Sequence, residues 1–320
     1  MPPIFFIHVP KTAGTSFRLG VEDYLGQESI IYDYGLKAKE TSGLVREHLY
    51  GEVNDPWYFY RECQNQGIGF VGGHVGIRRF VTICRIGNSV TFVREPLRRA
   101  VSEFEHFVRH YGYEGTMMEF CSRPVMQNRQ SELLQAVPLE AIGLIGLTER
   151  YEESIELFNA RFSWSVAVRE GNNSRDLANG EAYQLNESEE KELRQLNQKD
   201  IALYRQCTEL FDTRYKLYQS GLRFCHARIQ QSSDQIVTGW AWWEDGSDAP
   251  VEIELLLNGE PVQTKFATDL RPGLCWLHPP RGAYVGFSFP KVGREGDTVQ
   301  CRISETGQCF PSKPISITKS

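Results

Sequence analysis

The chain has 320 residues, of which 41% are hydrophobic and 24% are charged, and its formal net charge is −6. This composition is that of a globular protein with room for about two domains, and the negative charge argues against nucleic acid or an anionic membrane as a partner. No apolar run approaches the roughly 18 residues of a membrane span, and the N-terminus lacks the basic segment of a signal peptide. We therefore expect a cytoplasmic protein with no transmembrane segment.

Residues 1–221 alternate short apolar runs with helical patterns. Five runs are apolar on both faces, as are the strands of a parallel sheet covered by helices; they read IFFIHV, IGFVGG, SVTFV, AIGLIGL and SWSVAV. Helical stripes follow the first run, from Phe17 on, and the third run, where Pro96 suits the first helical turn. Further helices are predicted at about 149–160 and 187–219. This succession predicts a doubly wound α/β domain over residues 1–221.

The pattern changes at about residue 222. Six short extended segments follow, separated by turn residues; they read QIVTGWAWW, VEIELLL, PVQTKFA, AYVGFSF, TVQCRIS and PISIT. Asn258-Gly259, between the second and the third segment, is a strong hairpin signal. Residues 222–320 are therefore predicted to form a smaller, all-β sandwich domain.

The cysteines and histidines give no metal-site signal. Eight cysteines are scattered without a C-x-x-C pair, so we expect reduced and mostly buried thiols. His106 and His110 have a spacing that suits metal ligands on a helix, but Phe107 occupies the place of the glutamate in the zinc-protease pattern. We therefore interpret this segment as a solvated helix face and predict no metal.

The segment HVPKTAGTSF, residues 8–17, has the composition of an anion-binding loop. It follows an apolar run and opens a helix, whose first N–H groups are unsatisfied and whose dipole favours an anion. Gly14 lets the backbone approach a ligand closely, and Lys11 adds a positive charge. Thr15 and Ser16 are candidates to cap the helix and to donate to oxygens. A tight turn with a capped helix and no ligand would have the same composition.

A nucleoside-triphosphate site fits this loop poorly. The P-loop pattern G-x-x-x-x-G-K-[ST] places Lys directly after the second Gly, whereas Lys11 precedes Gly14 by three residues. The run SVTFV is followed by Arg94 and not by the carboxylate that supports Mg²⁺ in such sites. Arg94 reverses the local charge and favours an anion other than a magnesium-bound triphosphate.

The loop and the segment VTFVREPLRRAVSEF, about eighty residues later, together closely resemble the sulfotransferases that use 3′-phosphoadenosine 5′-phosphosulfate (PAPS). The nearest group is the type 2 carbohydrate enzymes, such as heparan sulfate 2-O-sulfotransferases. The resemblance covers about residues 4–219 and implies a P-loop-like sulfotransferase fold. It implies that the 5′-phosphosulfate is bound by Pro10, Lys11, Thr12, Ala13, Gly14, Thr15 and Ser16. Arg94 and Ser102 are implied to bind the 3′-phosphate, and we expect Arg99 to form a structural ion pair.

Weaker resemblances agree, among them the segments LIGLTERYEESIELF and KDIALY. GGHVG resembles the family's His-Gly-His-Val segment, with His74 at the second His and Gly72 replacing the first, and Ala13 stands where the family has Gly. His74 is the candidate catalytic base, because a neutral His suits proton removal from a hydroxyl near pH 7; a structural His is the alternative. His8 precedes the loop and is expected to support the site.

The sequence thus predicts an enzyme that moves the sulfuryl group of PAPS to an acceptor hydroxyl by in-line transfer. Lys11 would act with the helix N–H groups on charge that develops on the leaving phosphate. The alternatives are a small-molecule kinase with a degenerate P-loop and a non-catalytic nucleotide-binding protein. A kinase would prefer Mg-ATP, whereas turnover of PAPS separates the enzyme from a binding protein.

The acceptor is not specified by a motif. Acidic residues outnumber basic ones over residues 1–221, so a polyanion such as heparan would need a local basic track, to which Arg78 and Arg79 could contribute. A less charged glycan, a glycolipid or a small metabolite is expected instead. The C-terminal pattern weakly resembles β-domains appended to bacterial surface-polysaccharide enzymes. Its tryptophans are candidates either for the sandwich core or for a sugar-stacking face; they are Trp240, Trp242, Trp243 and Trp276.

Overall fold

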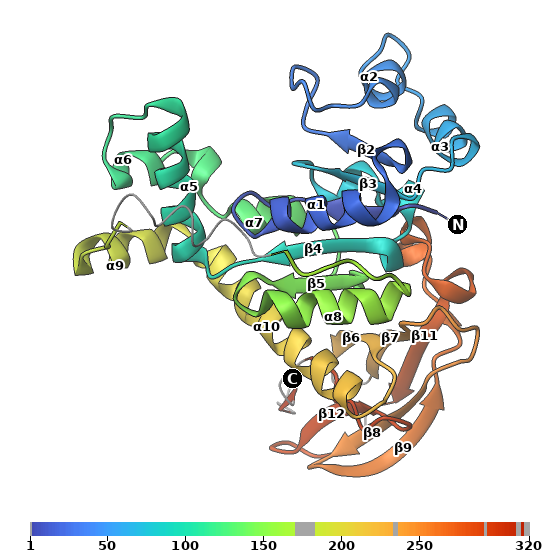
Figure 1. Ribbon diagram of the computed structural model, residues 1–320. Coiled ribbons are helices and arrows are strands. Elements are labelled where there is room, and N and C mark those ends of the chain that lie inside the picture. Colours follow the sequence, from blue (N-terminus) through green and yellow to red (C-terminus); the bar gives the residue numbers. More distant parts are fainter. Residues whose placement is uncertain (1, 170–182, 233–235, 291–292, 312–314, 317–320) are drawn as a thin grey trace. The chain divides into compact units, whose positions relative to one another are not determined.

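The computed structural model of the chain describes residues 2–169, 183–232, 236–290, 293–311 and 315–316 (Figure 1). The chain is a mixed α/β protein that divides into two compact units. The first unit comprises residues 1–84, 88–137 and 144–208, and the second comprises residues 85–87, 138–143 and 209–320. The domain boundary predicted after residue 221 stays a prediction.

The first unit contains a five-stranded parallel sheet with the order β2-β3-β1-β4-β5. The strands are β1 (Ile4–Ile7), β2 (Ile30–Asp33), β3 (Phe70–Gly73), β4 (Ser89–Val93) and β5 (Leu144–Leu147). The first strand in the chain lies in the middle of the sheet, with β3 on one side and β4 on the other. Its carboxyl end therefore lies at a switch point of the topology, where open α/β sheets bind ligands.

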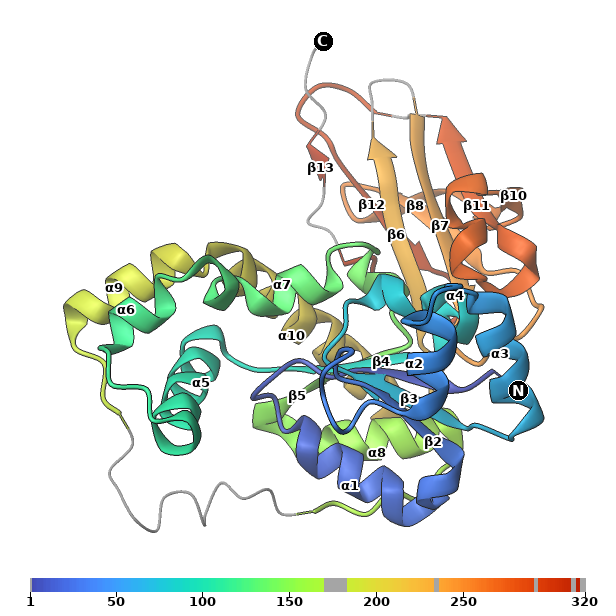
Figure 2. The same ribbon diagram turned by 90° about the horizontal axis from the view of Figure 1, so that it is seen from above.

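Helices cover both faces of this sheet. The α-helices in the described part of the chain are α1 (Gly14–Leu25), α2 (Gly43–Leu49), α3 (Pro56–Asn65), α4 (Val81–Cys84), α5 (Pro96–Tyr111), α6 (Met117–Cys121), α7 (Arg129–Leu134), α8 (Tyr151–Phe162), α9 (Glu187–Leu196) and α10 (Gln198–Gln219). Of these, α6 and α9 pack with α5 and do not lie on the sheet. Successive strand residues face opposite ways, so Phe6 packs on Phe17 of α1 while Phe5 packs on Phe80, next to α4. Phe17 also contacts Phe158 of α8, and Figures 1 and 2 show α1 and α8 side by side.

Three details differ from the sequence-based expectations for this unit. The run SWSVAV is not a strand, because the backbone N–H and C=O of Val166 bond to the side chain of Asn159 and not to a neighbouring strand. Conversely, β2 was not predicted. The helical pattern expected over 187–219 is two helices, α9 and α10, which meet at Asn197.

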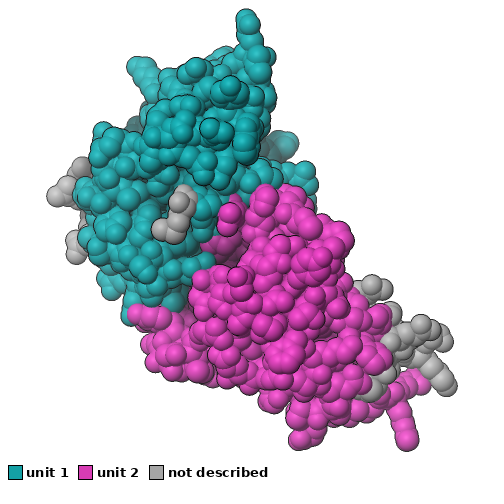
Figure 3. Space-filling model, turned by 90° about the vertical axis from the view of Figure 1, so that its right-hand side faces the viewer, with its two compact units in different colours: residues 1–84, 88–137, 144–208 teal, residues 85–87, 138–143, 209–320 magenta. Residues whose placement is uncertain are grey.

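The second unit, magenta in Figure 3, contains two four-stranded antiparallel sheets with the orders β10-β11-β7-β6 and β13-β12-β8-β9. The strands are β6 (Cys225–Ser232), β7 (Ile236–Trp243), β8 (Glu252–Leu257), β9 (Glu260–Phe266), β10 (Asp269–Leu270), β11 (Tyr284–Pro290), β12 (Thr298–Ile303) and β13 (Ile315–Ser316). Both sheets contribute side chains to one hydrophobic core, as in a sandwich. Asn258 and Gly259 both have positive φ at the β8–β9 turn, which confirms the predicted hairpin.

All eight cysteines are free and six of them are buried, which confirms the expectation of mostly buried thiols. None of the helices in the described ranges combines the length and the apolar character needed to cross a membrane.

Candidate functional site

The predicted anion-binding loop joins β1 to α1 in a tight turn. Lys11 and Ala13 have left-handed backbones, with φ of 67° and 62°. The Thr12 hydroxyl between them donates to the Val9 carbonyl over 2.8 Å, and Thr12 is completely buried. This hydroxyl therefore closes the turn, and Thr12 can take part in anion binding only through its backbone. Ala13 occupies a conformation that favours glycine, the residue that stands there in the family that the sequence resembles.

The N-terminus of α1 is open to a ligand. Ala13 is the N-cap residue, and no side chain in the described part of the chain caps the helix. The expectation that Thr15 or Ser16 would cap it is wrong, because Gly14 is already helical and both hydroxyls lie inside the first turn, C-terminal to the cap position. The first N–H groups of α1 thus lack a side-chain partner, as anion binding by a helix N-terminus requires.

Gly14 lies directly against the imidazole of His8. A β-carbon at Gly14 would lie 2.2 Å from Cδ2 of His8 and 2.3 Å from its Nε2, so only glycine fits there. His8 is 6% exposed, and its backbone N–H donates to the Gly73 carbonyl over 2.9 Å. Gly14 therefore brings a buried histidine, and not only the backbone, close to the loop.

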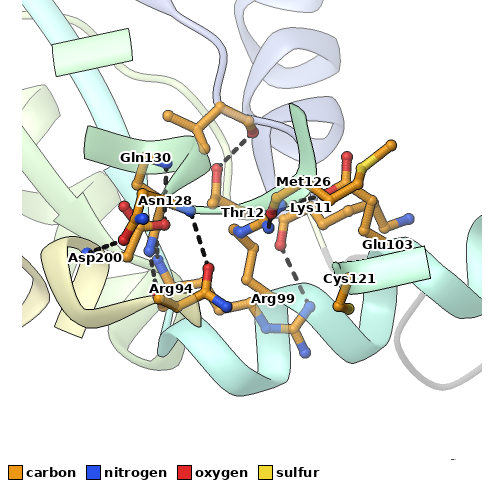
Figure 4. Close-up of polar contacts among 12 residues, drawn as sticks. Lys11, Thr12, Arg94, Arg99, Glu103, Cys121, Met126, Asn128, Gln130 and Asp200 are labelled. Atoms are coloured by element: carbon orange, nitrogen blue, oxygen red, sulfur yellow. Dashed lines mark hydrogen bonds and ion pairs between the residues drawn. The ribbon is translucent and has the colours of Figure 1, made fainter. Parts of the chain in front are cut away.

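Arg94 lies beside the loop because β4 pairs with β1 (Figure 4). Its Nη1 donates to the Lys11 carbonyl over 3.3 Å. The Arg94 backbone is held on both sides by the amide of Gln130, which accepts from Arg94 N at 2.9 Å and donates to Arg94 O at 3.0 Å. The guanidinium thus lies at the carboxyl ends of both strands, near Lys11.

Asp200 supports this arrangement from α10, and sequence reasoning did not single it out. Its carboxylate is completely buried and accepts from the backbone N–H groups of Gln130 and Ser131, at 3.1 and 2.7 Å, and from the Ser131 hydroxyl at 2.7 Å. These bonds hold the start of α7, and through Gln130 they fix the Arg94 backbone. The signal available in the sequence was the segment KDIALY, which contains Asp200.

Ser102 and Arg99 lie on α5, the helix that follows Arg94. Arg99 forms a buried ion pair with Glu103 and so has the structural role expected of it. Ser102 is half-buried and lies one turn before His106, on the same face of α5. Burial first, and then the charge of Lys11, lower the pKa of His106. Lys11 therefore lies near this face of α5, which is the face that carries Ser102.

His74 directly follows β3, and its ring meets that of His8. The ring centroids are 4.5 Å apart in an edge-to-face arrangement, and the Tyr34 ring lies 4.8 Å from His74. Burial of the ring and, next, the charge of Arg129 lower the pKa of His74 to about 4. His74 also keeps an exposed edge. It is therefore a neutral imidazole at pH 7, and a substrate can approach it from solvent.

The glycine at position 72, where the resembled family has its first His, belongs to a crowded part of the sheet. A β-carbon there would lie 3.0 Å from Cε1 of Phe70 and 3.6 Å from Cε1 of Tyr32. A histidine at this position would need the surrounding rings to move. Glycine at position 72 avoids this crowding, and His74 is the histidine that the chain keeps here.

Of the two arginines near His74, Arg78 and Arg79, the second is engaged in an ion pair. Arg79 Nε lies 3.0 Å from Oδ2 of Asp33, which is completely buried. The other carboxylate oxygen of Asp33 accepts from the Tyr50 hydroxyl at 2.9 Å. Arg79 thus neutralises a buried carboxylate, and Arg78 is the exposed member of the pair.

The tryptophans of the second unit divide into two kinds. Trp240, Trp242 and Trp243 are 1–3% exposed, so they are buried packing residues and form no sugar-stacking face. Trp276 is 37% exposed, so it is the remaining candidate for a sugar-stacking face. A pocket of about 440 Å³ opens beside β9 in the same unit, and the half-exposed ring of Phe266 lines it.

Comparison of the chain with protein-family models, with curated proteins and with solved structures gave no match. Two cationic side chains, a helix N-terminus and a neutral imidazole lie at the carboxyl ends of β1, β3 and β4, an arrangement that can hold an anionic group and remove a proton beside it.

Proposed function

We propose that the chain is a PAPS-dependent sulfotransferase, similar to the type 2 carbohydrate sulfotransferases. The main support for this proposal is the hydrogen bond from Arg94 to the Lys11 carbonyl. The two segments on which the sequence resemblance rests thereby meet at one end of the sheet. The strand order, with the loop after the central strand, supports assignment of the first unit to the P-loop-like sulfotransferase fold.

In the proposed binding mode, the loop from Pro10 to Ser16 holds the 5′-phosphosulfate and Arg94 and Ser102 hold the 3′-phosphate. The open N-terminus of α1 and the Lys11 side chain supply positive charge to the 5′ side. The guanidinium of Arg94 provides a charge-assisted, directional donor for the 3′-phosphate. Thr12 contributes its backbone only, since its hydroxyl is bonded to Val9.

In the proposed reaction, the acceptor hydroxyl oxygen forms a bond to sulfur as the bond between sulfur and the 5′-phosphate oxygen breaks. The hydroxyl proton passes to His74, which is neutral at pH 7 and exposed on one side. The leaving group is the 3′,5′-bisphosphate, and Lys11 with the helix N–H groups stabilises the charge that develops on it. His74 and Lys11 are thus the proposed catalytic residues.

The acceptor that fits best carries little charge. Because Arg79 is paired with buried Asp33, the basic track beside His74 is short. A glycan, a glycolipid or a small metabolite is proposed over a polyanion, and nucleic acid is not a proposed partner. A cytoplasmic location is part of the proposal and is supported by the eight unpaired cysteines.

Radiolabelled PAPS, offered with a panel of neutral oligosaccharides, glycolipids and small hydroxyl metabolites, tests this function. Transfer of label to any acceptor, and its loss in Lys11→Ala, would support the proposal. A chain that binds PAPS and transfers label to nothing would be a binding protein. Phosphate transfer from Mg-ATP would identify the kinase instead.

A further inference from the structure

Three side chains from three different segments form a polar chain that ends at the loop. Tyr34 directly follows β2, and its hydroxyl lies 3.1 Å from Nδ1 of His8. Arg18, on the second turn of α1, is close enough for its charge to act on the same hydroxyl. The Tyr34 hydroxyl thus lies between Arg18 and His8.

In the arrangement proposed below, the Tyr34 hydroxyl donates to His8. A guanidinium has donors and no acceptor, so Arg18 can only donate to the phenol oxygen. Burial, the largest effect, raises the pKa of Tyr34, and the opposing charge of Arg18 is smaller, so the phenol keeps its proton at neutral pH. Within the described ranges, the Nδ1 atom of His8 is the acceptor that this proton reaches.

His8 is then fixed in one neutral tautomer. Burial, the largest effect, lowers the pKa of His8 well below its usual range, and the neighbouring His74 ring and the charges of Arg18 and Lys11 lower it further. A neutral imidazole carries one proton. Since Nδ1 accepts from Tyr34, that proton is on Nε2.

Nε2 of His8 lies beside the loop. The imidazole lies against Gly14, where a β-carbon would come within 2.3 Å of Nε2. His8 is 6% exposed, and within the described residues its imidazole makes one hydrogen bond, at Nδ1. Nε2 is not among the fully buried polar atoms of the described residues, so a ligand in the loop can reach it.

We propose that Arg18 and Tyr34 position His8 so that its Nε2–H is a further hydrogen-bond donor to the anion in the loop. This inference rests on the proposed anion site. It also separates the roles of the two touching imidazoles. In His8, Nε2 already carries a proton and Nδ1 accepts the hydrogen bond from Tyr34, so neither nitrogen can take a proton from the acceptor hydroxyl. His74 therefore remains the candidate base. Tyr34 and Arg18 are positioning residues, and His8 is a ligand-binding residue.

The tautomer can be measured in the full-length protein without ligand. In NMR spectra of isotope-labelled histidine, assigned with a His8→Gln variant, we expect a protonated Nε2 and a hydrogen-bonded, unprotonated Nδ1 for His8. Tyr34→Phe removes the donor and should shift the signals towards a mixture of tautomers. Arg18→Gln should do so more weakly. Tyr32→Phe is the matched control, because its hydroxyl donates to Glu22 at 2.6 Å and not to His8. A protonated Nδ1 in the wild type, or unchanged His8 signals in Tyr34→Phe, would overturn the relay.

Calorimetry with the 3′,5′-bisphosphate and with pyrophosphate tests the donor role. His8→Leu should weaken binding about tenfold or more, as expected for loss of a hydrogen bond to a charged group. His8→Gln, which places an amide N–H near the position of Nε2, should stay within about threefold of the wild type. Equal affinities in His8→Leu and the wild type would contradict the donor role. If the wild type binds neither anion, both the donor role and the proposed function are wrong, while the NMR result still decides the relay.

Discussion

Arg94 and Lys11 are 83 positions apart in the chain, yet the guanidinium of Arg94 donates to the Lys11 carbonyl over 3.3 Å. This contact joins the end of β4 to the loop after β1. It places two cationic residues at the carboxyl ends of β1 and β4, where the N-terminus of α1 is also open. The proposed site for a doubly anionic nucleotide depends on this relationship.

Replacement of Arg94 by Ala should weaken bisphosphate binding by roughly tenfold or more and leave affinity for AMP nearly unchanged. A charge-assisted hydrogen bond contributes about 1.5–3 kcal/mol, and only the 3′-phosphate would lose it. Calorimetry with both ligands measures the difference. Arg98→Ala, an exposed arginine on the same helix, is the control. Equal losses for the two ligands would mean that Arg94 serves the fold and not the 3′-phosphate.

Replacement of His74 by Ala should lower turnover by roughly 10²–10⁴, the usual contribution of a general base, with bisphosphate affinity kept within about threefold. Because the pKa of His74 is lowered to about 4, its neutral form predominates at every pH well above that value. The protonation state of His74 should therefore not change turnover between about pH 6 and 8, and turnover should fall as the pH approaches 4, where His74 becomes protonated. Near-normal turnover in the variant would place the base elsewhere.

Replacement of Gly14 by Ala should destabilise the protein by about 1–3 kcal/mol, the usual cost of overpacking, and should weaken bisphosphate binding. The added β-carbon would overlap the His8 ring, which must then move away from the loop. Urea unfolding of Gly14→Ala, His8→Ala and the double variant measures the coupling. We expect the double variant to be more stable than the sum of the single effects predicts. Strict additivity would show that the two residues do not meet.

Replacement of Asp200 by Asn should lower the free energy of unfolding by about 1–3 kcal/mol, because an amide cannot accept all three buried donors that the carboxylate serves. Bisphosphate affinity should fall less than in Arg94→Ala, since Asp200 acts on Arg94 only through Gln130. Urea unfolding and calorimetry on one preparation check both effects. Glu192→Gln, an exposed position on α9, serves as the control. An unchanged unfolding free energy would rule out this supporting role.

The sequence was most informative where the determinants are local. Apolar runs identified β1, β3, β4 and β5, and Asn258-Gly259 identified the β8–β9 hairpin. The error at SWSVAV arose because the Asn159 side chain, and not a strand, satisfies the backbone of Val166. Apolar composition alone does not show whether a neighbouring strand or a side chain will bond to the backbone of such a run.

The positions of the candidate site residues in the fold could be predicted in part for the same reason. The loop, Arg94 and His74 each follow a predicted strand, and parallel pairing brings strand ends together. Tyr34 and Asp200 were missed because each acts through contacts with residues distant in the chain, Tyr34 with His8 and Asp200 with Gln130. The caps assigned to Thr15 and Ser16 were wrong because the helix begins at Gly14, which makes Ala13 the N-cap residue and puts both hydroxyls inside the first turn.

Titration of the full-length chain with the 3′,5′-bisphosphate in the presence of EDTA tests the central claim most directly. The account predicts saturable binding without divalent metal, because Arg94 stands where a metal-supporting carboxylate would be and the α1 N-terminus is open. Binding should be lost in Lys11→Ala combined with Arg94→Ala. Absence of bisphosphate binding, together with ATP binding that requires Mg²⁺, would contradict the account.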